Sequence, residues 1–105
     1  MDKIAALKEI LEQDRKNAFA RYGLAMELAG QGQTAAALAE FDRLLADQPE
    51  YTAGYFMAAQ TLARAGRAAD ARQRLVDGIT CARRTGNQHA EREMQAMLDE
   101  MEMPD

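Results

Sequence analysis

The sequence predicts an all-α fold built from repeated helical hairpins, and two observations lead to this prediction. The first is a period of 34 residues: when the 105-residue chain is compared with itself at that shift, apolar and small residues fall on residues of the same kind. The matched pairs include Ala25 with Ala59, Leu28 with Leu62, Gly32 with Gly66, Ala37 with Ala71, Phe41 with Leu75 and Leu45 with Ile79. The second is that each period holds two amphipathic helical patterns separated by a glycine. A fixed period of this length is typical of arrays in which neighbouring hairpins bury a shared core.

The first half of the chain is predicted to contain three helices. Residues 2–13 form an N-terminal half-repeat, because their apolar positions stand in register with those of a later second helix; these positions are Ile4, Leu7, Ile10 and Leu11. Repeat one spans residues 18–51, with helices from Ala18 to Gly30 and from Thr34 to Ala46. We expect Asn17 and Thr34 to cap these two helices, because short polar side chains accept hydrogen bonds from the free amides of a first turn.

The second half follows the same plan with two departures. Repeat two spans residues 52–85, with a first helix from about Thr52 to Ala65. Gly78 stands where repeat one has Leu44, which favours close packing at some loss of helix propensity. Arg83 stands where repeat one has Pro49, so we expect the helix that begins at Ala68 to continue to Thr85-Gly86. Asn87 then caps a last helix, residues 87–101, which is predicted to cover the apolar flank of the array as a C-terminal capping helix.

On these residues the chain resembles the tetratricopeptide repeat (TPR) family, in the form of a small bacterial-type protein. The positions that carry the resemblance are Leu24, Ala25, Leu28, Gly32, Ala37, Phe41 and Pro49 in the first repeat, and Tyr55, Ala59, Leu62, Gly66 and Ala71 in the second. The resemblance implies a right-handed α-solenoid of antiparallel helix pairs, six helices in about two and a half repeats. It also implies a non-catalytic protein–protein interaction module or adaptor, whose concave groove holds a peptide or a partner's helix.

In proteins that this one resembles, the first helix of each hairpin lines the groove. The partner-binding residues implied by that placement are Phe19, Tyr22, Met26, Phe56, Gln60 and Arg64. The family's clamp for a terminal carboxylate uses Lys and Asn, and three of its positions here are Tyr22, Met26 and Met57, which favours apolar anchors instead. The alternative interpretation is that Tyr22 and Phe56 pack in the core, as aromatic stripes at helical spacing often do.

The remaining inventory argues against an enzyme, and no catalytic residue, cofactor or metal is expected. Cys81 and His89 are the chain's single cysteine and histidine, and a catalytic pair of the two is disfavoured. His89 and Glu93 share a helix face, but two ligands without a third make a metal site less plausible than an exposed helix pair. A self-associating module is the main alternative to a partner-binding one, and a small enzyme or metal carrier is the least favoured.

Charge and hydropathy restrict the partners. With 13 basic and 17 acidic residues the net charge is −4, which argues against nucleic acid. No apolar run is long enough to span a membrane, and a single cysteine suits a reducing, cytoplasmic location. Arginines concentrate between residues 64 and 84 and carboxylates between 87 and 105. We expect these two segments to pair with each other rather than with an outside ligand.

Overall fold

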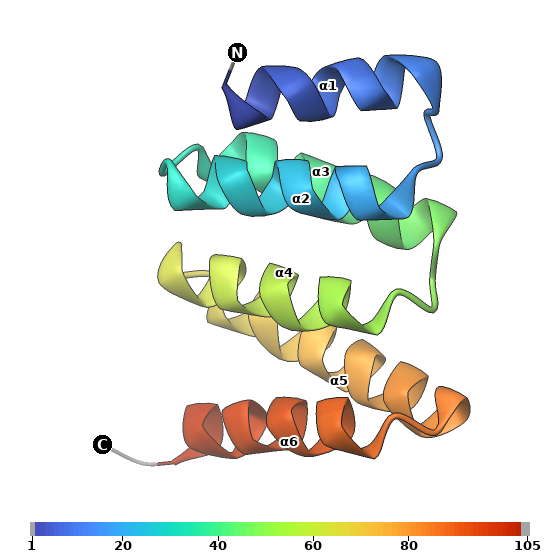
Figure 1. Cartoon of the computed structure of the whole chain (residues 1–105). Coiled ribbons are helices and arrows are strands. Elements are labelled where there is room, and N and C mark those ends of the chain that lie inside the picture. Colours follow the sequence, from blue (N-terminus) through green and yellow to red (C-terminus); the bar gives the residue numbers. More distant parts are fainter. Residues whose placement is uncertain (1, 104–105) are drawn as a thin grey trace. The chain divides into compact units, whose positions relative to one another are not determined.

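The structure is a computed structural model that describes residues 2–103, and within that range the chain forms six helices and no strand (Figure 1). The helices are α1 (Lys3–Gln13), α2 (Ala18–Gly30), α3 (Thr34–Asp47), α4 (Thr52–Arg64), α5 (Ala68–Thr85) and α6 (Gln88–Glu102). The chain divides into two compact units: unit 1 ends at Tyr51 and holds α1–α3, and unit 2 begins at Thr52 and holds α4–α6. The predicted all-α fold is confirmed, and each helix begins and ends within one residue of the predicted position.

Three glycines end helices in the same way. Gly32, Gly66 and Gly86 have φ angles of 77°, 79° and 73°, in the left-handed region that favours glycine. After each of them the chain donates a backbone hydrogen bond to the helix just completed, as when the Gln33 amide bonds the Leu28 carbonyl at 2.9 Å. This is the Schellman arrangement, which satisfies carbonyls that the helix end leaves free. The extension of α5 to Thr85, predicted from the missing proline, is confirmed.

Two of the three predicted caps are confirmed and one is wrong. The Asn17 and Asn87 side chains accept hydrogen bonds from the Ala20 and Ala90 amides at 2.9 and 3.1 Å. Thr34 is instead the first residue of α3; Gln33 is at the cap position and its side chain bonds no helix amide. The turn after α2 is so short that Gln33 both completes the Schellman bond and opens α3. Thr34 therefore lies inside the first turn of α3, one residue after the cap position.

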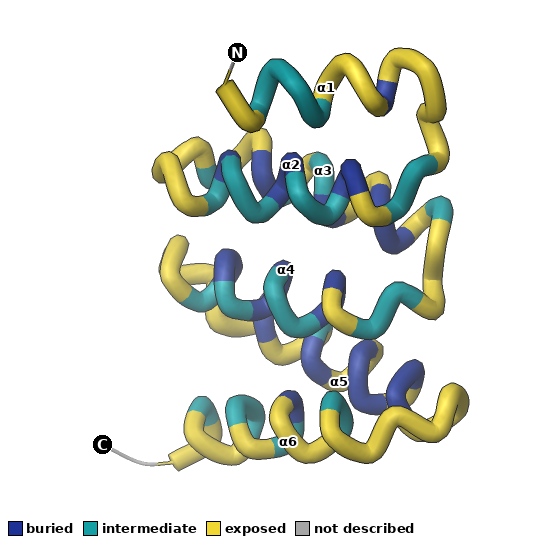
Figure 2. Tube along the Cα trace, viewed as in Figure 1, coloured by how far each residue is buried: buried dark blue, intermediate teal, exposed yellow. Residues whose placement is uncertain are grey.

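Unit 1 buries a core between α2 and α3 and partly covers it with α1 (Figure 2). The buried apolar residues are Leu11, Ala20, Leu24, Ala25, Leu28, Ala37, Phe41, Leu44 and Leu45. Ala25 and Ala37 have no exposed surface, which agrees with their expected role of letting paired helices approach closely. Leu7 fills the space over Gly23, with a methyl carbon 3.3 Å from where a Cβ at residue 23 would be. The repeat's apolar register therefore places α1 against α2.

Unit 2 buries its core among α4, α5 and α6. The buried apolar residues are Tyr55, Ala58, Ala59, Leu62, Ala71, Leu75, Ile79, Cys81, Ala82 and Met94. Gly78 lets two neighbours approach, since a Cβ at residue 78 would be 2.5 Å from the Met94 sulfur and 2.6 Å from the Tyr55 Cβ. The predicted close packing at Gly78 is confirmed. Within the described residues, no helix is both long and apolar enough to cross a membrane.

Candidate binding groove on unit 2

A groove of about 520 Å³ lies between α4 and α6, and we call it the α4–α6 groove. It is lined by Phe56, Gln60, Ala63, Arg64, Glu93, Ala96, Met97 and Glu100. The four lining residues of α4 recur three and four positions apart, and so do those of α6, so each set occupies one face of its helix. Ala63 and Ala96 are small, which keeps the space between the two helices open. The lining is thus apolar at Phe56, Ala63, Ala96 and Met97 and polar at the other four positions.

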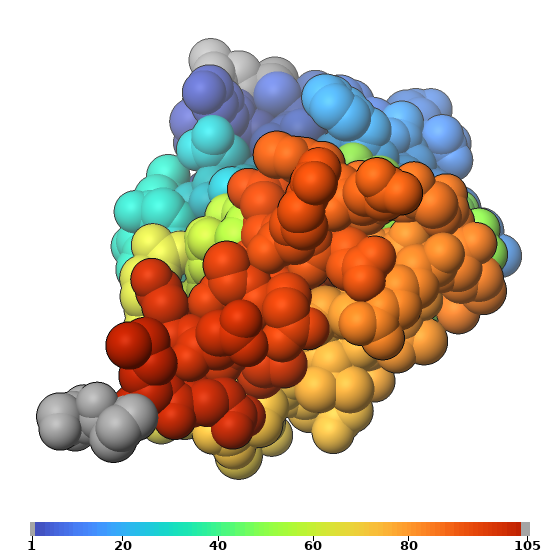
Figure 3. Space-filling view, turned by 90° about the horizontal axis from the view of Figure 1, so that it is seen from below, coloured from blue at the N-terminus to red at the C-terminus, as the bar shows by residue number. Residues whose placement is uncertain are grey.

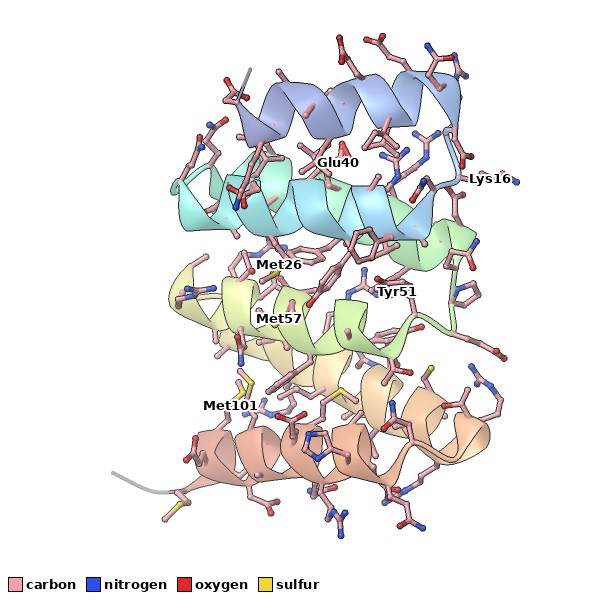
Figure 4. The ribbon with its side chains drawn as sticks, viewed as in Figure 1. Lys16, Met26, Glu40, Tyr51, Met57 and Met101 are labelled. Atoms are coloured by element: carbon pink, nitrogen blue, oxygen red, sulfur yellow. The ribbon has the colours of Figure 1, made fainter. Side chains whose placement is uncertain are left out.

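The position of α6, and so of one wall of the groove, is held by apolar packing and two ion pairs. Met94 is fully buried over Gly78 and Tyr55. Arg83 of α5 pairs with Glu91 at 2.7 Å, and Arg72 pairs with Glu102 at 3.1 Å. Figure 3 shows α6 lying along α5, and Met101, labelled in Figure 4, projects from α6 toward the rest of unit 2. The expected pairing of the arginine-rich and acidic segments is confirmed for these two pairs.

The charged lining residues of the groove have different surroundings. Arg64 and Glu100 form no ion pair within residues 2–103. Glu93 pairs with His89 one turn earlier at 3.1 Å, and the His89 side chain is 81% exposed. This is the exposed helix pair expected for His89 and Glu93. The groove therefore presents one guanidinium and two carboxylates around an apolar floor.

The structure brings three of the six predicted partner-binding residues together. Phe56, Gln60 and Arg64 line the α4–α6 groove. Phe19, Tyr22 and Met26 lie on α2 in unit 1; Phe19 is 78% exposed and Met26 is half-buried. Which surface binds a partner stays a prediction for all six.

Tyr22 belongs partly to the core of unit 1. Its ring meets Phe41 edge-on with centroids 6.5 Å apart and lies 5.4 Å from the ring of Tyr51, which Figure 4 labels. Burial raises the pKa of Tyr22 above 10.0, and the neighbouring Tyr51 hydroxyl raises it further. The alternative interpretation of Tyr22 as a packing residue therefore has direct support, while its half-exposed surface remains accessible.

Sequence reasoning missed the contribution of α6 to the groove. Glu93, Ala96, Met97 and Glu100 all line it, whereas the sequence predicted only a covering role for this helix. The pattern that points to them is the order of elements: α6 follows α5 as α4 follows α3, so α6 takes the place of a first helix in a further repeat. First helices are the ones expected to line a groove.

Sequence reasoning also missed a buried cation in unit 1. Arg21 is only 9% exposed and donates to the Glu40 carboxylate at 2.6 Å and to the Arg15 carbonyl at 2.8 Å. Glu40, labelled in Figure 4, extends from α3 toward α2. These groups border a smaller hollow of about 380 Å³, together with Lys8, Leu11, Glu12 and Leu24. The 34-residue period offered a clue, because it aligns Arg21 in the sequence with Tyr55, which is buried.

The described residues show no assembled metal-binding cluster. No group of three or more His, Cys, Asp or Glu side chains gathers within residues 2–103. Cys81 is buried, with its sulfur 3.5 Å from the Thr52 hydroxyl. It packs as a small apolar residue, as expected from the sequence.

Comparison with known proteins agrees with this architecture. The family model described as tetratricopeptide repeat matches residues 28–98. A tetratricopeptide repeat-containing protein of Pseudomonas aeruginosa is 29% identical over 99 residues, covering 94% of each chain. A solved tetratricopeptide repeat domain protein of Salinibacter ruber is 31% identical with a TM-score of 0.80, covering 85% of this chain and 90% of its own.

A more distant structure shares the fold alone. YrrB, a tetratricopeptide repeat protein with an unusual peptide-binding site, is 19% identical with a TM-score of 0.76, over 89% of this chain and 46% of YrrB. Repeats of this kind are in general protein–protein interaction modules. The family match covers more than half of the chain and agrees with the observed helices and glycine turns. The chain therefore belongs to the tetratricopeptide repeat family.

Proposed function

We propose that this protein is a non-catalytic interaction module, an adaptor or scaffold that holds a peptide or a helix of a protein partner in the α4–α6 groove. The observation that carries the proposal is the groove itself, a hollow of about 520 Å³ with an aromatic ring and a thioether in its lining. Concave sites with an apolar lining and a few polar groups are typical binding sites.

The lining residues suit distinct tasks in binding. Phe56 is large and rigid, so holding it against a ligand buries much apolar area with little loss of conformational entropy. Met97 is flexible and polarizable, so it adapts to the shape of an apolar side chain. Arg64 and Gln60 supply donors that orient the ligand's polar groups. We expect Phe56 to provide the largest share of the affinity.

The proposal includes a contribution from unit 1. Phe19 presents an almost free aromatic ring, and Tyr22 and Met26 are half-exposed on the same helix. These three residues and the groove residues Phe56, Gln60 and Arg64 are our proposed partner contacts. We place the activity in the cytoplasm, because a chain with a single cysteine forms no internal disulfide and suits a reducing compartment.

Peptides selected from a random phage-displayed library on the immobilised protein provide a test. Calorimetry then compares the best peptide on the wild type, Phe56→Ala, Ala96→Trp and the control Val76→Ala, which alters an exposed apolar residue of α5 outside the groove. Phe56→Ala is expected to weaken binding by more than about 1 kcal/mol. Ala96→Trp changes an exposed residue and fills the groove, so it keeps the test valid if Phe56→Ala harms folding. Peptides that bind all four proteins equally would refute the proposal.

Self-association is the second candidate, and exposed apolar side chains favour it. Phe19 is 78% exposed, Met103 66% and Ile10 44%. Large exposed apolar groups at separate points of a small protein are able to form contacts between copies. Sedimentation equilibrium of the wild type and Phe19→Ser tests this candidate. A monomer at all concentrations excludes it.

A further inference from the structure

We propose that the occupant of the α4–α6 groove is an amphipathic segment of another protein with basic side chains along the edge that faces α6. This inference rests on the proposed function and adds the chemistry of the ligand. The segment inserts apolar anchors between α4 and α6, where Phe56 and Met97 lie. Its basic groups then lie beside Glu93 and Glu100.

The carboxylates of α6 fall into two sets. Glu91 and Glu102 pair with arginines of α5, and Asp99 accepts a hydrogen bond from Gln95 at 2.9 Å. The first two join α6 to α5, and the hydrogen bond of Asp99 lies within α6. Glu93 and Glu100 line the groove instead, and neither forms an ion pair with an arginine in residues 2–103. Of the three α6 carboxylates that have no arginine partner, two therefore lie at the groove.

The spacing of these two carboxylates defines the ligand pattern. Glu93 and Glu100 are seven residues apart, which is two helical turns on one face and roughly 10 Å along α6. Two lysines or arginines seven positions apart on a helical ligand match that separation. An extended ligand matches it less well, because residues three positions apart, at roughly 3.3 Å per residue, point to opposite faces of the ligand. A helical ligand with one such pair gains two charge contacts without bending.

The opposite wall carries the opposite charge. Arg64 of α4 lines the same groove yet forms no ion pair with Glu93 or Glu100. A ligand between the walls is therefore able to contact both signs of charge, with an acidic or neutral polar edge toward Arg64. Complementary charges of this kind set the orientation and specificity of binding more than its raw affinity.

A second copy of this chain fits the groove less well. The exposed Ile10 on α1 lies among Glu9 and Glu12, whose charges would repel Glu93 and Glu100. Phe19 does follow the basic residues Arg15 and Lys16, but one phenylalanine side chain does not fill about 520 Å³. A partner with several anchors and a basic edge matches both the size and the charge.

The test uses two synthetic helical peptides with blocked ends and identical leucine anchors. One carries lysines seven positions apart beside the anchors, and its twin carries glutamates there. Calorimetry at low and physiological salt measures both on the wild type, on the double variant Glu93→Gln/Glu100→Gln and on Asp99→Asn. The last is a matched control, since it removes a carboxylate of α6 outside the groove.

The lysine peptide is expected to bind the wild type more tightly than the glutamate peptide. Added salt is expected to reduce this difference in affinity, because it screens the charges. The double variant should weaken the lysine peptide by roughly three- to tenfold, the combined effect of two surface ion pairs, with Asp99→Asn unchanged. Arg64→Gln should not weaken the lysine peptide.

Other results separate the failure of this inference from the failure of the proposed function. If both peptides bind equally and Phe56→Ala weakens both, the groove binds ligands and the charge inference is wrong. If neither binds the wild type, the basic amphipathic ligand is refuted, whereas the groove itself stands or falls with the library-selected peptides. If the protein forms a dimer that Phe19→Ser and the double variant both dissociate, the occupant is a second copy and the inference is overturned.

Discussion

The sulfur of Met94 in α6 lies only 2.5 Å from the point that a Cβ on Gly78 of α5 would occupy. The Tyr55 Cβ lies 2.6 Å from the same point. Contacts this short do not occur between real atoms of these kinds, and the Tyr55 Cβ is too close to its backbone to move freely. The three helices of unit 2 therefore meet at a residue that has no side chain.

Gly78→Ala is accordingly expected to destabilise the protein, although alanine is the better helix former by about 1 kcal/mol. We expect a net loss of roughly 1–3 kcal/mol, because the added methyl overfills a packed site. Gly30→Ala is the matched control: the space around Gly30 is open, so that change should be neutral or slightly stabilising. Urea denaturation of both variants checks this. If both variants had the same free energy of unfolding, α6 would be shown to be able to shift away from α5.

Phe41→Ala is expected to destabilise by about 3–5 kcal/mol, because Phe41 is fully buried and the change leaves a cavity beside Tyr22. Phe19→Ala makes the same chemical change at a residue that is 78% exposed. It should alter stability by less than about 0.5 kcal/mol. Chemical denaturation of the pair measures the difference, and a small effect at Phe41 would contradict the assigned repeat register.

Removal of the Glu40 carboxylate is expected to destabilise unit 1, because Arg21 would keep a nearly buried charge without its partner. Breaking a fully buried pair costs about 3–5 kcal/mol, and the Glu40 side chain is 26% exposed, so Glu40→Ala should cost roughly 1–3 kcal/mol. Arg43→Ala breaks the more exposed pair with Asp47 and should cost less than about 0.5 kcal/mol. Thermal unfolding followed by circular dichroism separates these outcomes.

Stability is expected to fall as the pH rises above 10. Burial raises the folded-state pKa of Tyr22, Tyr51 and Tyr55 above the model-compound value of 10.0. Above pH 10 the unfolded chain releases these phenolic protons while the folded chain still retains them, so alkali favours unfolding. The stability that these three tyrosines contribute is complete below pH 10, and it is lost as the pH rises through their raised folded-state pKa values. Urea denaturation across this pH range should show that the free energy of unfolding falls less steeply with pH in Tyr22→Phe than in the wild type. An equally steep fall would contradict a contribution from the raised pKa of Tyr22.

The helix boundaries were predictable because local chemistry determines them. Gly32, Gly66 and Gly86 adopt the left-handed conformation that ends a helix, and Asn17 and Asn87 supply caps. Thr34 failed as a cap because the preceding turn is too short, and turn length depends on how the Schellman bonds close. Local signals thus predict helix ends well, except where two helix ends share one residue.

The groove was predictable only in part. The face of α4 followed from helical periodicity, but α5 has 18 residues where α3 has 14, so the 34-residue register does not carry over to α6. Which face of α6 meets α4 depends on how Met94 packs over Gly78, a contact between residues far apart in the sequence. Arg21 was missed for a related reason, since its burial requires Glu40 on another helix.

Every residue that lines the α4–α6 groove belongs to α4 or α6, on one side of the connection at Gln48–Tyr51. The shape of the groove therefore does not depend on the backbone dihedral angles of that connection. A ligand that binds between α4 and α6 contacts a preorganised surface, and its binding does not require the Gln48–Tyr51 connection to lose conformational entropy. For a ligand that contacts α4 and α6 alone and none of Phe19, Tyr22 or Met26, changes of length or composition in the connection should leave the affinity of the groove intact.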